Sequence, residues 1–166
     1  MSAEMGVANE EERSDVTDIR QVLEQIDVAW NVHDASKFAA LFTGDARFTN
    51  VRGMQARGRD GVERFVAPLF ATMFSDSEQH TLRIDTAFLA PGLAAVDAWW
   101  TMHGARTLDG SPRPTRYGLF SLVMRTTTEG WRIAVWHNME LAGLPPEDPA
   151  AWRFVIFHNE GPTKAH

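Results

Sequence analysis

Apolar residues in the first part of the chain recur every three or four positions, which is the spacing of one face of a helix. The longest series predicts a helix over residues 15–33 with Ser14 as its N-cap. Its stripe consists of Val16, Ile19, Leu23, Ile26, Trp30 and His33. Similar spacing predicts a short helix capped by Asp34 and a third helix capped by Asp60, which we expect Pro68 to kink or shorten.

In the second half of the chain, apolar residues alternate with polar ones, as in strands that bury one face. After a short strand over residues 46–51 and a loop at Gly53–Gly58, the alternation predicts four strands, over residues 79–89, 93–107, 115–128 and 131–141. The turn at Glu129-Gly130 predicts a hairpin between the last two. Helices followed by antiparallel strands predict an α+β domain with its helices on one face of the sheet.

The phase of each strand predicts which side chains face the helices. In the last strand the set that contains His137 is apolar apart from that residue, so we assign it to the inner face. The same reasoning turns Asn50, Trp100 and Arg116 inward, and Trp30 belongs to the first helical stripe. We therefore expect a mostly apolar cavity with a few polar groups, a lining that suits a small organic ligand.

Each of these residues also has a purely structural interpretation. His137 in this position is typical of a hydrogen-bonded core histidine, and a buried Arg116 is typical of a pair with a carboxylate. Asn50 and Asn138 suit the capping of backbone groups at strand ends, and Trp30 suits an ordinary core position. If the strand phase is reversed, the polar groups of the pocket become Asp97, His103 and Tyr117.

The other face of the sheet is predicted to be rich in aromatic side chains. It carries Asp97, Trp99, Thr101, His103, Tyr117 and Trp136. A surface with this many aromatic groups favours an interface, so we expect a homodimer that forms through the outer face of the sheet.

Charge and composition narrow the class of protein. Residues 1–18 hold six acids and one base, so they account for most of the net charge of -6, and the rest of the chain is nearly neutral. This balance argues against nucleic acid or membrane partners. The absence of cysteine excludes disulfides and thiolate chemistry, and with no signal peptide or long apolar run we expect a cytoplasmic protein.

Motifs for metals and nucleotides are absent from the sequence. The six histidines show no HxH, HxxxH or HExxH spacing, and no glycine-rich phosphate-binding motif occurs, so we expect neither a metal nor a cofactor. Along the chain we expect a disordered acidic tail over residues 1–13 and one domain over residues 14–142. An extension over residues 143–166 is expected to pack on the domain or on a partner subunit.

The ordered set of elements and residues resembles the nuclear transport factor 2-like superfamily. The residues that carry the resemblance are Trp30, His33-Asp34, Phe42, FTNVRG at Phe48–Gly53, Gly58-Arg59, Arg116, GWRI before Ala134, and Asn138. Within this superfamily the chain is most similar to the SnoaL-like branch, especially the bacterial SgcJ/EcaC group. The resemblance implies a cone, in which a strongly curved antiparallel sheet wraps around the three helices and leaves a pocket between them.

Two functions follow from these observations. The first is a small-molecule-binding protein, or a cofactor-free cyclase, isomerase or dehydratase of polyketide-type secondary metabolism. In this hypothesis His137 transfers the proton, and Arg116 and Asn50 stabilise a developing negative charge on an oxygen. Trp30 and Trp100 form the apolar walls around the ligand. The second is a non-catalytic homodimeric binding or assembly module with the same fold.

Overall fold

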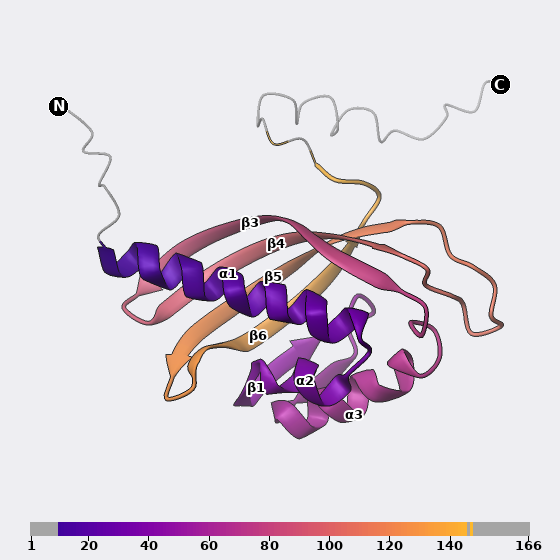
Figure 1. Cartoon of the computed structure of the whole chain (residues 1–166), viewed down its shortest axis with the longest axis horizontal. Coiled ribbons are helices and arrows are strands. Elements are labelled where there is room, and N and C mark those ends of the chain that lie inside the picture. Colours follow the sequence, from indigo (N-terminus) through magenta and orange to yellow (C-terminus); the bar gives the residue numbers. More distant parts are fainter. Residues whose placement is uncertain (1–9, 146, 148–166) are drawn as a thin grey trace, which may run out of the picture.

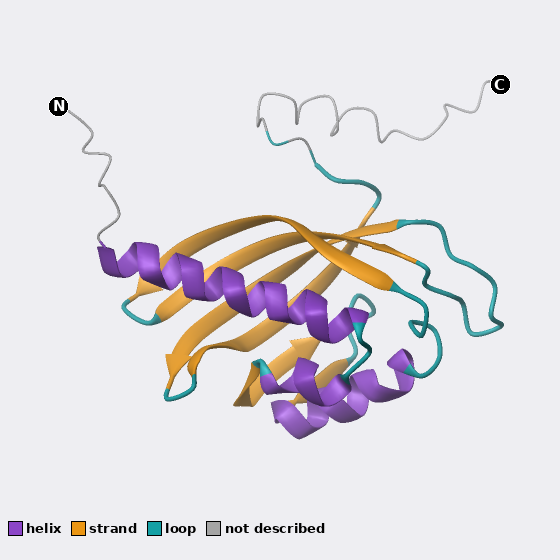
Figure 2. Cartoon of the chain, viewed as in Figure 1, coloured by secondary structure: helices purple, strands orange, loops and turns teal. Residues whose placement is uncertain are grey.

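The sheet and the helices of this protein form two layers. The computed structural model describes residues 10–145 and 147. Its elements are α1 (Glu10–Asn31), α2 (Ala35–Ala40), β1 (Phe42–Thr49), β2 (Gln55–Arg57), α3 (Gly58–Phe70), β3 (Glu78–Ala90), β4 (Leu93–His103), β5 (Arg116–Thr127) and β6 (Gly130–Leu141). Helix α1 lies lengthwise on the concave side of the curved sheet, and α2 and α3 pack together beside β1 (Figures 1 and 2). The predicted α+β fold class is confirmed.

The strands form one mixed sheet with the order β2-β1-β6-β5-β4-β3. Strands β3 to β6 pair antiparallel with their sequence neighbours, as the turn signals predict. Strand β1, however, runs parallel to β6, so the expectation of a wholly antiparallel sheet is corrected. Parallel strands cannot be joined by a tight turn, and β1 is separated from β6 by a helix and four strands. The parallel pairing therefore has no local turn signal in the sequence.

Helix α1 begins earlier than its apolar stripe predicts. It starts at Glu10, so Ser14 lies inside the helix and is not its N-cap, and the last four residues of the predicted tail are helical. Three acids in its first turn favour this earlier start through the helix dipole. The stripe itself is correct, because Ile19, Leu23 and Ile26 are fully buried.

Helix α3 also differs from its predicted bounds. It begins at Gly58, preceded by Arg57 in an extended conformation, so Asp60 lies in the first turn and is not the N-cap. Pro68 lies inside the helix, two residues before its last residue, Phe70. Strand β2 occupies part of the segment predicted as a loop and pairs with β1.

The two terminal segments fall mostly outside the described residues. The predicted tail over residues 1–13 is described only from residue 10, and the predicted extension over residues 143–166 only at 143–145 and 147. The packing expected for the extension therefore lies outside the described part. No helix among the described residues is long and apolar enough to cross a membrane.

Candidate functional site

A small cavity lies between the helices and the inner face of the sheet, with a volume of about 60 Å³. Its walls come from α1, α3, β1, β4, β5 and β6 and from the turns after β1 and α3. The lining residues are Trp30, Phe48, Asn50, Val51, Phe65, Val66, Leu69, Phe74, Trp100, Met102, Arg116, Trp136 and Asn138. Four residues predicted from the sequence to contact a ligand, Trp30, Asn50, Trp100 and Arg116, thus lie around one cavity.

The inner faces of β4 and β5 follow the predicted phase. Buried and half-buried residues alternate over residues 93–102 of β4 and 116–124 of β5, with Trp100 and Arg116 on the buried side. Asp97, His103 and Tyr117 therefore lie on the outer face, and the alternative of a reversed phase is wrong for these two strands.

The phase of β6 changes at a β-bulge. Val123 of β5 pairs with Val135, whereas the next residue, Met124, pairs with Ile133, so Ala134 is an extra residue without a partner. A bulge bends the strand and exchanges the faces of all residues beyond it. Trp131 and Ile133 face inward as predicted, but beyond the bulge Trp136 is buried and His137 is exposed.

Two predictions from the sequence are therefore wrong. His137 is exposed and is not among the residues that line the cavity. The proton-transfer role assumed that it faced the cavity. Trp136 does not belong to the outer face, because it is only 1% exposed and lines the cavity together with Asn138. Position 134 is an alanine, and neither a glycine nor a proline there indicates a bulge in the sequence.

Among the described residues that line the cavity, Arg116 is the one with a charged side chain. It is 6% exposed, and its Nε and Nη2 atoms donate hydrogen bonds of 2.6 and 3.0 Å to the two carboxylate oxygens of Glu140. These hydrogen bonds hold the pKa of Glu140 below its ordinary value, with a further contribution from Arg113, whose Nη2 lies 3.3 Å from the same carboxylate. The structural interpretation of Arg116, a pair with a carboxylate, is therefore observed, and Glu140 is the partner.

The third nitrogen of this guanidinium has a weaker partner. Nη1 of Arg116 lies 3.7 Å from the sulfur of Met102, and a thioether is a poor acceptor. The guanidinium carbon lies 5.7 Å from the centre of the Trp100 ring and 5.8 Å from that of Phe74. Arg116 therefore presents a buried donor without an oxygen acceptor among the described residues.

The tryptophans of the cavity differ in how their N–H groups are satisfied. Trp30 donates to the hydroxyl of Ser77 at 3.0 Å, and Trp100 donates to the amide oxygen of Asn138 at 3.1 Å. The buried Nε1 of Trp136, in contrast, has no acceptor among the described residues. A second residue that lines the cavity thus holds a buried donor without an acceptor among the described residues.

Asn50 shapes the turn that borders the cavity. Its side-chain oxygen accepts hydrogen bonds of 2.9 Å from the backbone N–H groups of Arg52 and Met54. This arrangement matches the structural interpretation of Asn50, and it leaves its side-chain N–H₂ group without a partner in the described part of the chain.

A separate, half-buried carboxylate, that of Asp27, joins α1 to β3. Asp27 accepts hydrogen bonds from the backbone N–H of Thr81 at 2.7 Å, from the Thr81 hydroxyl at 3.1 Å and from the Gln79 amide at 3.1 Å. Burial raises the pKa of Asp27, while these hydrogen bonds act in the opposite direction. Asp27 does not line the cavity, so its contacts are structural.

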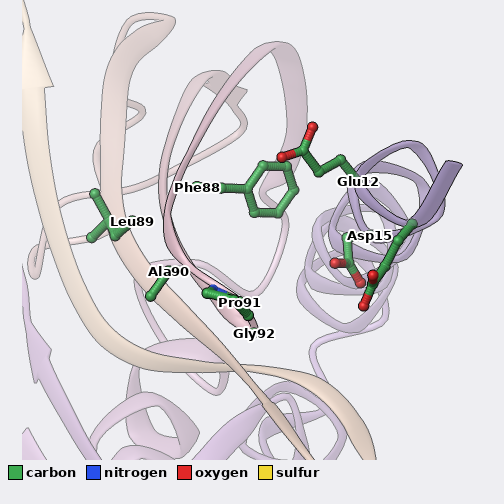
Figure 3. Close-up of a pocket in the computed structure, with 8 residues that line it drawn as sticks. Glu12, Asp15, Phe88, Leu89, Ala90, Pro91 and Gly92 are labelled. Atoms are coloured by element: carbon green, nitrogen blue, oxygen red, sulfur yellow. The ribbon is translucent and has the colours of Figure 1, made fainter. Parts of the chain in front are cut away.

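An acidic hollow of about 250 Å³ lies at the other end of α1 (Figure 3). Phe88 extends from β3 toward α1, where Glu12 and Asp15 lie, and Pro91 and Gly92 of the turn after β3 also line the hollow. Asp15 also accepts a hydrogen bond of 2.9 Å from Trp131, so it joins the helix to β6. In the described residues no group of three or more histidines and acids is arranged to hold a metal ion.

Comparison with known proteins agrees with this architecture. The model of the SnoaL-like domain matches residues 22–158. An uncharacterized protein with a cystatin-like fold from Caulobacter vibrioides is 26% identical, with a TM-score of 0.71, and the match covers 85% of this chain and 95% of that one. No curated protein matches the chain.

Two more distant structures share the fold. One, provisionally named scytalone dehydratase, from Novosphingobium aromaticivorans, is 15% identical with a TM-score of 0.69 over 84% of this chain and 95% of that chain. The other is a hexachlorocyclohexane dehydrochlorinase, 10% identical with a TM-score of 0.69 over 84% of this chain and 97% of that chain. Together with the curved sheet around the helices, the match over most of the chain shows that this protein belongs to the SnoaL-like domain family of the nuclear transport factor 2-like superfamily.

Proposed function

We propose that the cavity binds a small, flat organic molecule that carries a carbonyl or similar oxygen acceptor. The observation that supports this proposal is that two residues lining the cavity, Arg116 and Trp136, each carry a buried donor, Nη1 and Nε1 respectively, without an oxygen acceptor among the described residues. Buried donors without acceptors are costly, and a ligand oxygen removes that cost. The aromatic rings of Trp30 and Trp100 supply the apolar walls.

The size of the cavity restricts the ligand. Its volume of about 60 Å³ corresponds to about two water molecules, and a cavity that binds benzene measures about 150 Å³. Binding of an aromatic ring therefore requires one wall to move. The wall formed by the half-buried Phe65, Leu69 and Phe74 is the one we assign, since the wall formed by the sheet is fixed by strand pairing.

A second candidate is catalysis of enolisation, as in a cofactor-free isomerase, cyclase or dehydratase of polyketide-type secondary metabolism. The relatives named as a dehydratase and a dehydrochlorinase favour this candidate, and a guanidinium is suited to stabilising an enolate oxygen. However, no histidine or carboxylate lines the cavity in the described part of the chain. The geometry therefore supports binding better than proton transfer.

Two probes of similar shape test the proposal, acetophenone and ethylbenzene, since only the first has an oxygen acceptor. We expect the wild-type protein to bind acetophenone more tightly than ethylbenzene. Arg116→Met is expected to lower the affinity for acetophenone about tenfold, because a charge-assisted hydrogen bond is lost, and to leave ethylbenzene unaffected. Isothermal titration calorimetry measures both affinities.

Arg113→Met is the matched control, because Arg113 contacts the same Glu140 carboxylate but does not line the cavity. It is expected to leave both affinities unchanged. Equal binding of the two probes, or equal losses in the two variants, contradicts the proposal. Incubation of acetophenone in D₂O separates the candidates: exchange of its methyl protons faster than in buffer supports enolisation, and binding without exchange supports a binding protein.

We also propose that the chain forms a homodimer through the outer face of the sheet. Leu119 of β5 lies between Trp99 of β4 and Met139 of β6 in one row across the strands, with Tyr117 beside it. Trp99 is stacked under the guanidinium of Arg83 at 3.8 Å, and Met139 is 43% exposed. These residues form an apolar stripe in the middle of the face.

Replacement of Leu119 by glutamate is expected to convert the dimer to a monomer, because it buries an unpaired charge in the stripe. Size-exclusion chromatography with light scattering measures the mass. Val28→Glu introduces the same charge at an exposed position of α1 and serves as the control. A wild-type protein that is monomeric at high concentration contradicts the proposed dimer.

Two finer assignments remain predictions from the sequence. Membership of the SgcJ/EcaC group is supported by the residues that carry the resemblance, from Trp30 to Asn138. A cytoplasmic location is supported by the absence of cysteine from the sequence.

A further inference from the structure

A second hollow, on the outer face of the sheet, is lined by polar side chains that have no partners in the described part of the chain. It lies at the corner formed by β1, β2 and β6 and has a volume of about 290 Å³. Its lining residues are Arg47, Phe48, Thr49, Gln55, Ala56, Arg57, Val135 and His137. It is distinct from the cavity between the helices and the sheet, with which it shares only Phe48.

Two arginines stand directly opposite each other in this hollow. Arg47 of β1 is the cross-strand partner of Arg57 of β2, and both side chains are exposed. Directly opposed residues on neighbouring antiparallel strands lie close together, so like charges in these positions repel each other. The nearest acid along β1, Asp45, does not relieve this repulsion, because its carboxylate is paired with Arg125 at 2.8 Å.

A second row of donors lies beside the arginines. Thr49 pairs with Gln55 on one side and with His137 on the other, so the three residues form a row across β2, β1 and β6. The side chains of both rows, the two arginines included, form no hydrogen bond or ion pair with any described residue. Five polar side chains, two of them permanently charged, thus line one hollow without a hydrogen-bond or ion-pair partner among the described residues.

We propose that this hollow binds a phosphate dianion, either free phosphate or the phosphate group of a small monoester. Two guanidinium groups match the charge of a dianion, and their planar N–H groups match phosphate oxygens in pairs. Thr49, Gln55 and His137 supply further donors to the remaining oxygens. The apolar side chains of Ala56 and Val135 border the hollow and offer a surface for the organic part of an ester.

A single carboxylate explains these residues less well. It carries one negative charge and two oxygens, so it leaves one arginine and most of the second row without a partner. The phosphate site also gives His137 a role on the face where the structure places it. This role is independent of the ligand proposed for the inner cavity.

Titration calorimetry with inorganic phosphate, at constant ionic strength balanced with potassium chloride, tests the site. We expect saturable binding to the wild-type protein. Arg47→Gln and Arg57→Gln are each expected to weaken it about tenfold, since each removes charge-assisted hydrogen bonds. Arg20→Gln removes the same charge from an exposed position of α1 and is expected to leave binding unchanged.

Backbone NMR shifts locate the site, and phenyl phosphate distinguishes the two sources of phosphate. The amide signals of Thr49, Gln55 and His137 are expected to move on titration with inorganic phosphate. Tighter binding of phenyl phosphate assigns the site to an ester, and equal or weaker binding assigns it to free phosphate. Absence of saturable binding, shifts that map elsewhere, or an equal loss in Arg20→Gln overturns the proposal. So does a change of molecular mass in Arg47→Gln, because the corner is then a contact between two copies of the chain.

Discussion

Replacement of Trp136 by alanine is expected to lower the free energy of unfolding by about 3–5 kcal/mol, the usual cost of emptying a large aromatic site in a core. Trp136 is 1% exposed, and its ring lies 4.1 Å from that of Phe120 and 5.6 Å from that of Phe42. It also contacts Phe38 of α2 and is stacked on Phe48 of β1. The substitution therefore removes aromatic contacts that join β6 to α2, β1 and β5. Urea denaturation followed by far-UV circular dichroism measures the loss.

Trp136→Phe is the matched control. It keeps an aromatic ring at the centre of the cluster and removes the buried N–H group that has no acceptor among the described residues. We expect a loss of about 1 kcal/mol or less, because the smaller ring is offset by the missing cost of the unsatisfied donor. Equal losses in the two variants contradict the central position of Trp136. If Trp136 were on the outer face, both substitutions would have effects within about 0.5 kcal/mol.

The position of Trp136 shows where a sequence pattern stops being sufficient. Alternation correctly predicts the inner faces of β4 and β5, because both strands run without interruption through the residues around Trp100 and Arg116. In β6 the same alternation fails at Ala134. The sequence does not show this change of phase, because Val135 and Met139, which the structure places on the outer face, are apolar and suit a buried face equally well.

The parallel pairing of β1 with β6 is a second feature that local sequence does not encode. Phe48 of β1 pairs with Trp136, so the contact joins residues that are far apart in the chain. Such a contact depends on how α2 and α3 pack, and no turn signal specifies it. The helical stripe of α1, in contrast, is entirely local, which is why its buried residues could be predicted even though its first turn could not.

The site combines both kinds of information. Asn50, Trp100 and Arg116 are positioned by features that the sequence displays, namely a strand end and two regular strands. Asn138 and Trp136 reach the same cavity only because of the bulge, and His137 leaves it for the same reason. One extra residue in β6 thus exchanges an ionisable group for an indole and an amide. This exchange is the physical reason why the structure supports binding better than acid–base chemistry.

Replacement of Gly118 by alanine is expected to lower the free energy of unfolding by about 3 kcal/mol. Gly118 of β5 pairs directly with Trp100, whose indole lies over it. A Cβ atom at this position would come within 2.0 Å of Cζ2 of Trp100 and 2.5 Å of the carbonyl oxygen of Met139. The backbone oxygen of Met139 cannot move without disturbing the pairing of β5 with β6, and the Trp100 ring is buried in the core, so it has little room to move. Displacement of Trp100 also breaks its hydrogen bond to Asn138, so the cavity wall shifts as well.

Gly44→Ala provides the comparison for this effect, since a Cβ atom at Gly44 meets nothing within 4 Å. It makes the same chemical change in another strand of the sheet, and we expect it to alter stability by no more than about 0.5 kcal/mol. Thermal and urea denaturation of the two variants measure the difference, and binding of acetophenone reports on the wall. Unchanged stability of Gly118→Ala contradicts the packing of Trp100 on Gly118. Unchanged stability together with unchanged binding also means that Trp100 is not a fixed wall of the cavity. The proposed flat ligand then has no contact with the Trp100 ring, and the proposal for this site is contradicted.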